Sequence, residues 1–176
     1  QEGQLLPRTL LPDIPTMMGG FTPKNFSLQY DGAVPAHQAL IRSLNIPAVH
    51  ALRQFRFEKF HALLQEVGIT TLDKPADHYG LSLILGGAEA TLWDVTGVYA
   101  SMARTLTHYF DRPGDLRYRP SDFHEPVYTH ASDKHDTTSY EASAPLRAGA
   151  VWLTFNALQE VYRPGEETGW RYFESS

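Results

Sequence analysis

Proline and glycine residues within the first 34 positions limit the fold of this chain more than any other sequence feature. The prolines are Pro7, Pro12, Pro15 and Pro23, and the pair Gly19-Gly20 lies among them. Proline cannot donate a backbone hydrogen bond and glycine loses much entropy when it is ordered, so a long helix is excluded here. Apolar side chains are frequent between these residues. We therefore predict that residues 1–34 form an extended, ordered segment that lies on the core.

Residues 35–107 have helical periodicity and are predicted to form a helical lobe. Pro35 suits the first turn of one short helix, and Ile46-Pro47 begins a second. Ser43-Leu44-Asn45 falls at the junction, so a hydroxyl and a carboxamide lie two residues apart between the helices. Serine and asparagine also favour helix ends for purely structural reasons. The tripeptide alone therefore does not separate a capping role from a functional one.

Two longer apolar stripes predict further helices in this lobe. From Arg53 to Val67 apolar residues recur at three- and four-residue spacing, and Gly68 follows as a stop signal. Thr91 is a favourable N-cap for a helix that extends to position 107, and we interpret Asp94 as a capping group rather than a catalytic acid. The residues predicted to be buried are Phe57, Phe60, Leu64 and Val67 in the first helix, and Leu92, Val95, Tyr99, Met102 and Leu106 in the second.

The apolar run from Leu81 to Leu85 lies between these two helices. Periodicity does not distinguish a short buried strand from an apolar loop in so short a run. Gly86-Gly87 follows it and predicts a tight bend. No Gly-Lys-Ser or Gly-Lys-Thr follows, which disfavours a phosphate-binding loop.

Residues 108–142 are polar and are predicted to form a loop or a short hairpin, and residues 143–176 a last helix and an exit segment. Ser143 is the predicted cap of this helix and Pro145 lies in its predicted first turn. The predicted buried stripe is Leu146, Ala150, Leu153, Ala157, Leu158 and Val161. Metal-ligand side chains gather in the polar segment, at His130, Asp133, His135 and Asp136. Their spacing matches no defined site, so no metal or cofactor is predicted, and a metalloenzyme centred on residues 124–136 is the least favoured alternative.

Composition narrows the functional classes. The formal net charge of −5 gives no basic footprint for a nucleic acid. The absence of cysteine excludes disulfides, thiolate zinc sites and cysteine nucleophiles. No apolar run is long enough to cross a membrane, so we expect any membrane anchor to lie outside this chain.

Several motifs occur in a defined order along the chain. They are Leu11-Pro12-Asp13-Ile14-Pro15-Thr16, Gly19-Gly20-Phe21 with Pro23, Asn25 and Phe26, the run Ala39 to Val49 around Ser43-Leu44-Asn45, Leu85-Gly86-Gly87, Thr91-Leu92-Trp93-Asp94-Val95 and Tyr99-Ala100-Ser101-Met102-Ala103. This order resembles the transpeptidase domain of class A penicillin-binding proteins. The resemblance covers nearly all of residues 1–110 and the helix at 143–161.

The resemblance implies an α+β fold of the penicillin-binding protein and serine β-lactamase type. In this fold a five-stranded antiparallel sheet accompanies an all-helical lobe, and we expect this chain to contain mainly the helical lobe with one hairpin at most. The implied activity is periplasmic DD-transpeptidation of peptidoglycan through a serine acyl-enzyme. The implied parent is a synthase with an inner-membrane anchor and an N-terminal glycosyltransferase domain. The implied partners are stem peptides that end in D-Ala-D-Ala, β-lactams and the remainder of the synthase.

The family works with three motifs, Ser-x-x-Lys, Ser-x-Asn and Lys-Thr-Gly. The resemblance assigns Ser43 as a hydroxyl relay and Asn45 as the group that binds the substrate amide and holds the first lysine. None of the four lysines has a serine three residues before it, and Lys-Thr-Gly does not occur. We therefore expect a partial domain, residues 1–176, that lies between the other two motifs and cannot acylate alone.

A non-catalytic binding or scaffold module derived from the same fold is the alternative. Such a module would keep the helical lobe and lose the chemistry. It predicts a self-contained fold without a large exposed apolar face.

Overall fold

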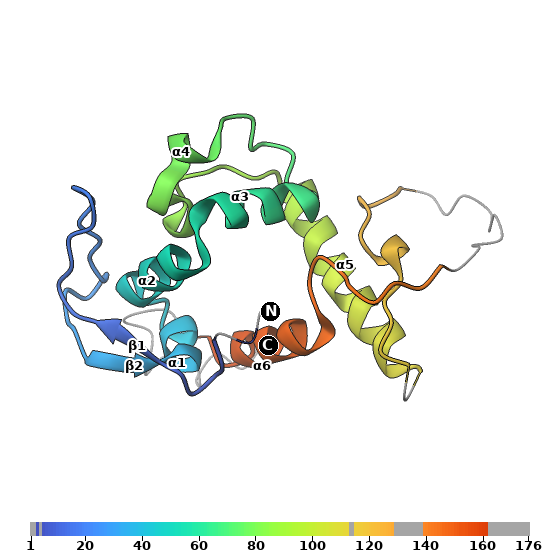
Figure 1. The fold of residues 1–176 in the computed structure, drawn as a ribbon, viewed down its shortest axis with the longest axis horizontal. Coiled ribbons are helices and arrows are strands. Elements are labelled where there is room, and N and C mark those ends of the chain that lie inside the picture. Colours follow the sequence, from blue (N-terminus) through green and yellow to red (C-terminus); the bar gives the residue numbers. More distant parts are fainter. Residues whose placement is uncertain (1–2, 4, 113–114, 129–138, 162–176) are drawn as a thin grey trace, which may run out of the picture. The chain divides into compact units, whose positions relative to one another are not determined.

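The protein, seen in a computed structural model, is described for residues 3, 5–112, 115–128 and 139–161 (Figure 1). The elements with their bounds are β1 (Leu10–Asp13), β2 (Gly32–Pro35), α1 (Ala36–Ile41), α2 (Asn45–Phe55), α3 (Phe57–Glu66), α4 (Ala76–Tyr79), the 3-10 helix η1 (Gly80–Leu85), α5 (Leu92–Phe110), the 3-10 helix η2 (Pro120–Asp122) and α6 (Ala148–Leu158). The chain divides into two compact units. One holds residues 2–56 and 153–176, and the other holds residues 57–152 with residue 1.

The unit containing residues 2–56 is built on a hairpin within the predicted extended segment. β1 and β2 pair antiparallel, from Leu10 opposite Pro35 to Asp13 opposite Gly32. The hairpin lies beside α1 and α2, as Figure 1 shows. Its apolar core joins the strands to the helices and consists of Leu11, Val34, Ala39 and Leu44. Because Leu11 and Asp13 share the inward face of β1, the hairpin buries one carboxylate together with this core.

The sequence-based helix from Arg53 to Val67 is divided in the structure. α2 ends at Phe55, and Arg56 has a φ of 80°, which is incompatible with a continuous helix. The amide of Arg56 donates to Leu52 O at 2.7 Å and closes α2. The prediction of one helix was therefore wrong, because the apolar period continues across a backbone break that it does not encode.

The unit containing residues 57–152 packs α3, α4 and η1 together. The apolar run Leu81 to Leu85 is neither the strand nor the loop that the sequence left open, because it forms η1. The predicted tight bend after it is confirmed. Gly86 has a φ of 91°, and a Cβ on Gly87 would lie 2.3 Å from Ser82 Oγ. Glycine is therefore required at Gly87 for close packing of the chain on itself.

α5 is the longest described helix, and its predicted cap is confirmed. The amide of Asp94 donates to Thr91 Oγ1 at 3.0 Å. Its predicted buried face is largely wrong, because Leu92 is 83% exposed, Val95 36% and Tyr99 48%. Met102 alone of the first four stripe residues is buried.

Small and polar residues form the buried face of α5 instead. Ser101 Oγ donates to Gly97 O at 2.8 Å, and Thr105 Oγ1 donates to Ser101 O at 2.9 Å. These bonds to the preceding turn satisfy the hydroxyls and allow them to be buried. A Cβ on Gly97 would lie 3.0 Å from Pro126 Cδ, so the small residues also let the following segment approach closely.

The last described helix, α6, begins later than predicted. It starts at Ala148, so the predicted cap Ser143 and the predicted first-turn Pro145 both lie before it. The amide of Ala148 donates to the hydroxyl of Tyr118 at 3.3 Å, a tertiary contact that the local sequence does not reveal. The predicted stripe is wrong at Leu153 and at Val161, which are 37% and 46% exposed.

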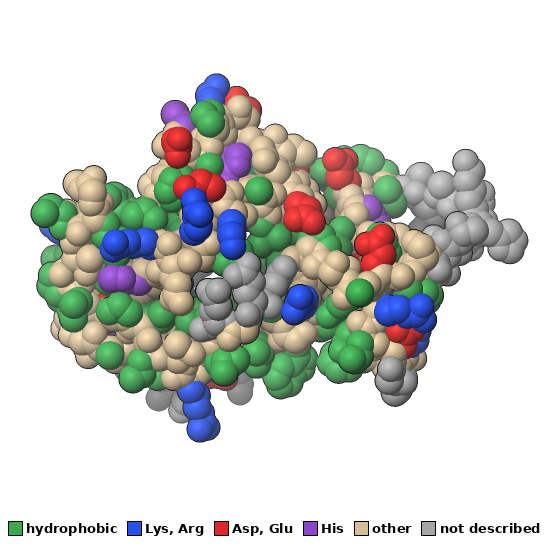
Figure 2. All heavy atoms as spheres, viewed as in Figure 1, with side chains coloured by type: hydrophobic (Ala, Val, Ile, Leu, Met, Phe, Trp, Pro, Cys, Tyr) green, Lys and Arg blue, Asp and Glu red, His purple; other side chains and the backbone are tan. Residues whose placement is uncertain are grey.

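Among the described residues, charged side chains of both signs are exposed. Figure 2 shows Lys and Arg side chains dispersed among acidic and hydrophobic ones. In the described residues, no helix combines the length and apolar character needed to cross a membrane.

Candidate functional site around Ser43 and Asn45

Ser43 lies in the turn that ends α1. The amide of Ser43 donates to Leu40 O at 3.0 Å, and the amide of Leu44 donates to Ala39 O at 2.9 Å. This pair of bonds is a Schellman motif, in which the chain turns back after the last helical residue. Leu44 and Ala39 belong to the same buried core cluster, which supplies the hydrophobic contact that accompanies such turns.

The backbone of Ser43 is in the left-handed region, with a φ of 52°. Glycine is the usual residue at this position of a Schellman motif because it has no Cβ. A residue other than glycine here costs about 1 kcal/mol in backbone strain. Ser43 is exposed, so burial of its side chain does not offset that cost. A serine therefore occupies a position at which the backbone conformation alone would favour glycine.

Asn45 is the first residue of α2 and is half-buried. Its Nδ2 donates to the carbonyl oxygen of Lys24 at 2.7 Å. Only the nitrogen end of the carboxamide can donate, so this bond fixes which way the amide faces. The loop between β1 and β2 thus determines the orientation of the Asn45 side chain.

The N-terminus of α2 is capped from a distance. Leu44, at the N-cap position, has no side-chain acceptor for the free amides of the first turn. The amide of Ile46 donates instead to Asn25 Oδ1 at 3.2 Å. The next residue, Pro47, has no amide hydrogen and therefore adds no unsatisfied donor to this first turn.

Asn25 is a residue of this site to which the sequence assigned no role. It is 2% exposed, and its Nδ2 donates to Asp13 Oδ1 at 2.7 Å and to Gln29 O at 3.0 Å. Asp13 is 1% exposed, and its Oδ2 accepts the amide of Asp31 at 2.9 Å. Asn25 ends the Gly-Gly-Phe-x-Pro-x-Asn motif, and that motif is the sequence signal that points to it.

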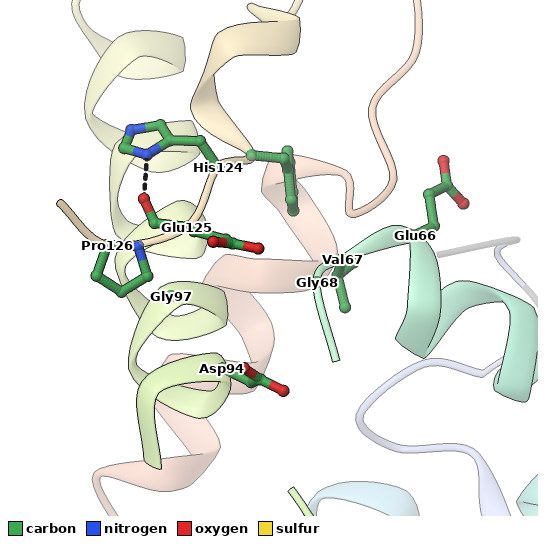
Figure 3. A pocket seen from close by; sticks show the side chains of 9 residues that line it. Glu66, Val67, Gly68, Asp94, Gly97, His124, Glu125 and Pro126 are labelled. Atoms are coloured by element: carbon green, nitrogen blue, oxygen red, sulfur yellow. Dashed lines mark hydrogen bonds between the residues drawn. The ribbon is translucent and has the colours of Figure 1, made fainter. Parts of the chain in front are cut away.

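A hollow with a volume of about 190 Å³ lies in the unit of residues 57–152 (Figure 3). It is lined by the end of α3, the first turns of α5 and the segment from Phe123 to Pro126. The Asp94 carboxylate faces it and accepts bonds from the amide and the hydroxyl of Thr70, both at 2.8 Å. The Thr70 amide, and then the Thr91 hydroxyl, hold the pKa of Asp94 below its usual value, although burial opposes this. A carboxylate held ionised in this way suits the structural role that the sequence suggested, with Thr70 as its main partner.

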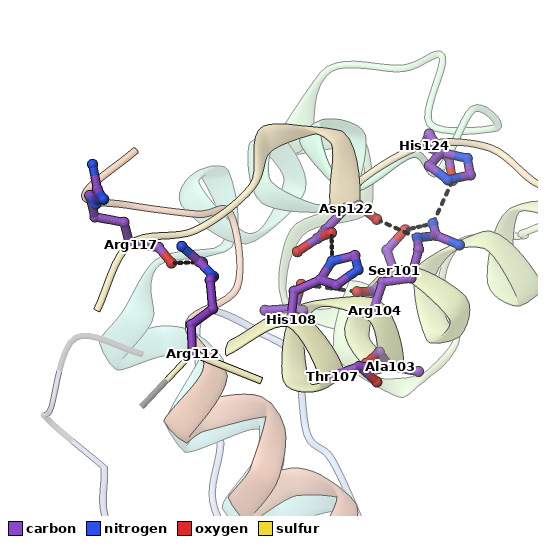
Figure 4. A network of polar contacts seen from close by, with 10 residues as sticks. Ser101, Ala103, Arg104, Thr107, His108, Arg112, Arg117, Asp122 and His124 are labelled. Atoms are coloured by element: carbon purple, nitrogen blue, oxygen red, sulfur yellow. Dashed lines mark hydrogen bonds and ion pairs between the residues drawn. The ribbon is translucent and has the colours of Figure 1, made fainter. Parts of the chain in front are cut away.

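A polar network joins α5 to η2 in the same unit (Figure 4). His108 Nδ1 lies 2.5 Å from Asp122 Oδ1, and the Asp122 side chain is buried. Arg104 donates to Asp122 O at 3.0 Å and to Ser101 Oγ at 2.9 Å. Burial lowers the pKa of Arg104, and the charge of Asp122 opposes this. The network fastens the 120–124 segment to the buried polar face of α5.

No group of three or more potential ligands for a metal ion is present among the residues the structure describes. The cluster of His130, Asp133, His135 and Asp136 lies outside the described residues.

Comparison with known proteins finds penicillin-binding proteins, although no family profile matches the sequence. The chain is 38% identical over 121 residues, 69% of its length, to penicillin-binding protein 1C of Escherichia coli (strain K12). It is 28% identical over 174 residues, 98% of its length, to penicillin-binding protein 1F of Bacillus subtilis (strain 168). It is 29% identical over 171 residues to penicillin-binding protein 1B of Vibrio cholerae. The chain spans only 15%, 22% and 19% of the lengths of these relatives.

The crystal structure of penicillin-binding protein 1A from Haemophilus influenzae matches with a TM-score of 0.50 and 27% identity, over 58% of this chain and 16% of that one. The fold and these matches define part of a penicillin-binding transpeptidase domain, mainly its helical lobe, as predicted. The chain belongs to the class A penicillin-binding proteins. Its N-terminal motifs resemble those of penicillin-binding protein 1C, in agreement with the 38% identity.

Proposed function

We propose that this chain supplies the Ser-x-Asn part of a peptidoglycan DD-transpeptidase active site, with Ser43 and Asn45 as its catalytic residues. The parent protein is a bifunctional synthase, anchored in the inner membrane, whose transpeptidase domain works in the periplasm. Its partners are stem peptides that end in D-Ala-D-Ala and the β-lactams that mimic them. Residues 1–176 form part of one domain, in which residues 35–107 are the lobe that carries the motif.

The chemistry requires a serine nucleophile with a neighbouring base, which the Ser-x-x-Lys motif of the parent provides. The nucleophile oxygen bonds to the carbonyl carbon of the penultimate D-Ala, and the amide bond to the terminal D-Ala breaks. The proton of the nucleophile passes to the departing amine, and Ser43 relays it. An acceptor amine then attacks the acyl carbon, the ester bond to the serine breaks, and the proton lost by the amine returns to the serine oxygen, which leaves the cross-link. Asn45 binds the amide of the donor peptide and the lysine of the first motif.

The left-handed backbone at Ser43 is the observation that carries this proposal. Strained backbone is retained where function requires it. Ser43 is exposed in this conformation, and the Lys24 carbonyl orients the carboxamide of Asn45 two residues further along the chain. Two polar groups held in this way can serve one substrate.

The test compares Ser43→Ala with Ser43→Gly in the full-length protein that contains this chain. Both remove the hydroxyl, so we expect each to slow covalent labelling by fluorescent penicillin by about 100-fold or more. Ser43→Gly also relieves the backbone strain, so it should be about 1 kcal/mol more stable than Ser43→Ala. Unchanged labelling in both variants would refute the assignment.

The isolated chain offers a second test, since no serine in it has the nucleophile motif. We expect no covalent labelling of residues 1–176 by fluorescent penicillin. A labelled serine in this chain would refute the division of the active site between this chain and the rest of the protein.

The exposed apolar stripe of α5 favours the partial domain over a self-contained scaffold module. Leu92, Val95 and Tyr99 are spaced as a buried face but are exposed in the described structure. A module that had evolved to fold alone would be expected to cover or replace such a face.

A further inference from the structure

The loop between β1 and β2 holds the Ser-x-Asn turn at three backbone or side-chain positions. Asn45 bonds to the Lys24 carbonyl, and the Ile46 amide bonds to Asn25. On the other side of the turn, Arg42 forms an ion pair with Asp31. The anchored residues therefore flank Ser43 and Leu44 on both sides.

Asp13 connects these anchors from within the core. One of its carboxylate oxygens accepts Asn25 Nδ2, and the other accepts the Asp31 amide. Hydrogen bonds to an ionised group are stronger than neutral ones. A single buried carboxylate thus fixes Asn25 and Asp31, two residues of the loop that contact the turn.

Asp13 and the loop residues that contact the turn are called the brace below. Its two contacts on either side of the turn differ in strength. The ion pair between Arg42 and Asp31 is exposed, with side chains 33% and 42% accessible, so solvent weakens it. Asn25 is fully enclosed and uses both N–H groups and its oxygen at once. Only a planar amide of this length supplies two donors and one acceptor here. Asn25 is therefore the residue of the brace that should tolerate substitution least.

We propose that Asp13 and Asn25 are positioning residues for the Ser-x-Asn site, an inference that rests on the function proposed above. Asn25 fixes the first turn of α2, and the adjacent Lys24 carbonyl fixes the Asn45 amide. Displacement of a reacting group by about 1 Å can slow an enzyme by about 100-fold, so a brace of this kind acts on the chemical step. It acts through Asn45 and does not itself touch substrate.

The experiment uses the full-length protein and measures acylation by fluorescent penicillin as a limiting rate and a half-saturating concentration. Asn25→Ala should lower the limiting rate by about tenfold or more and change the half-saturating concentration much less. Ser101→Ala is the matched control, because it removes a buried hydroxyl from α5 and should lower the melting temperature without slowing acylation. All rates are measured well below the melting temperature of each variant.

A double substitution makes the test independent of simple destabilisation. Asn25→Asp places two carboxylates against each other and should slow acylation at least as much as Asn25→Ala. Combining it with Asp13→Asn restores one amide donor facing one carboxylate and keeps acceptors for the amides of Ile46 and Asp31, although the Gln29 carbonyl loses its donor. The limiting rate should therefore recover in part and exceed that of Asn25→Asp alone by about threefold or more.

Three outcomes separate the two proposals. A slow Asn25→Ala with recovery in the double variant supports the brace. If Ser43→Ala and Asn45→Ala are slow but Asn25→Ala behaves like Ser101→Ala, the brace is overturned and the proposed function stands. If Ser43→Ala and Asn45→Ala both acylate normally, the proposed function fails, and the brace fails with it.

Discussion

The Ser-x-Asn turn and α5 solve the problem of burying polar groups in opposite ways. Around the turn, an apolar core encloses a few polar side chains whose hydrogen bonds reach across the sequence, as in Asp13 and Asn25. α5 buries polar groups that bond within the helix, as in Ser101 and Thr105, and exposes much of its apolar stripe. The first arrangement fixes the position of one segment against another. The second leaves an apolar surface on which another segment can pack.

Among the substitutions that test this comparison, truncation of a core residue in α2 should lower the free energy of unfolding most. Val49 is 0% exposed, so Val49→Ala should lower the free energy of unfolding by about 2 kcal/mol through lost burial and a residual cavity. Chemical denaturation followed by tryptophan fluorescence measures this. A loss below about 0.5 kcal/mol would show that the apolar core around the turn is not closely packed.

An intermediate effect is expected at the N-terminus of α5, where Asp94 is tied to Thr70. Asp94→Asn should lower the free energy of unfolding by about 1–2 kcal/mol at pH 7, because the carboxylate accepts two bonds. The lowered pKa of Asp94 stabilises the fold above the unfolded-state value near 4, and this contribution is lost as the pH falls through the folded-state value.

The difference in the free energy of unfolding between wild type and Asp94→Asn should therefore narrow as the pH falls below about 4. Denaturation curves at several pH values measure it. Asp77→Asn is the control, because Asp77 is exposed in α4 and its replacement should change stability by less than about 0.5 kcal/mol. A constant gap at all pH values would contradict the role of the Asp94 charge.

The smallest effect is expected on the apolar stripe of α5. Leu92 is 83% exposed, so Leu92→Gln should change the stability of the chain by less than about 0.5 kcal/mol. The measurement is the same denaturation curve as for Val49→Ala. A loss as large as that of Val49→Ala would show that the two regions are buried alike and would end the contrast between them.

The same contrast explains what the sequence could predict. Helix positions near α1, α2 and α5 followed from local signals, such as Pro47 in a first turn and Thr91 as a cap. The buried face of α5 did not follow, because Ser101 and Thr105 satisfy their hydroxyls locally and so can replace apolar residues at a packed surface. The break at Arg56 and the late start of α6 depend on backbone geometry and a tertiary contact, neither of which periodicity records.

The sequence was enough to propose the candidate site, but it did not predict the residues that support it. Ser43 and Asn45 were found by motif order, and their catalytic role remains a proposal. The sequence does not distinguish Asp13 from other acidic residues in a proline-rich segment. Its register in β1 is what places its side chain in the core. Bonds between residues 21 positions apart, as from Asn25 to Ile46, leave no periodic signal in the chain.

The two halves of the Ser-x-Asn turn should differ in how they open. The Leu44 amide is held by Ala39 within the same turn of chain, so α1 can form it without closing a long loop. The Ile46 amide depends on Asn25, 21 residues away, and is protected only while that loop is closed. Exchange of the Ile46 amide with solvent deuterium therefore reports on the loop, and exchange of the Leu44 amide reports on the helix. Two amides in one short segment thus report on two separate local unfolding events.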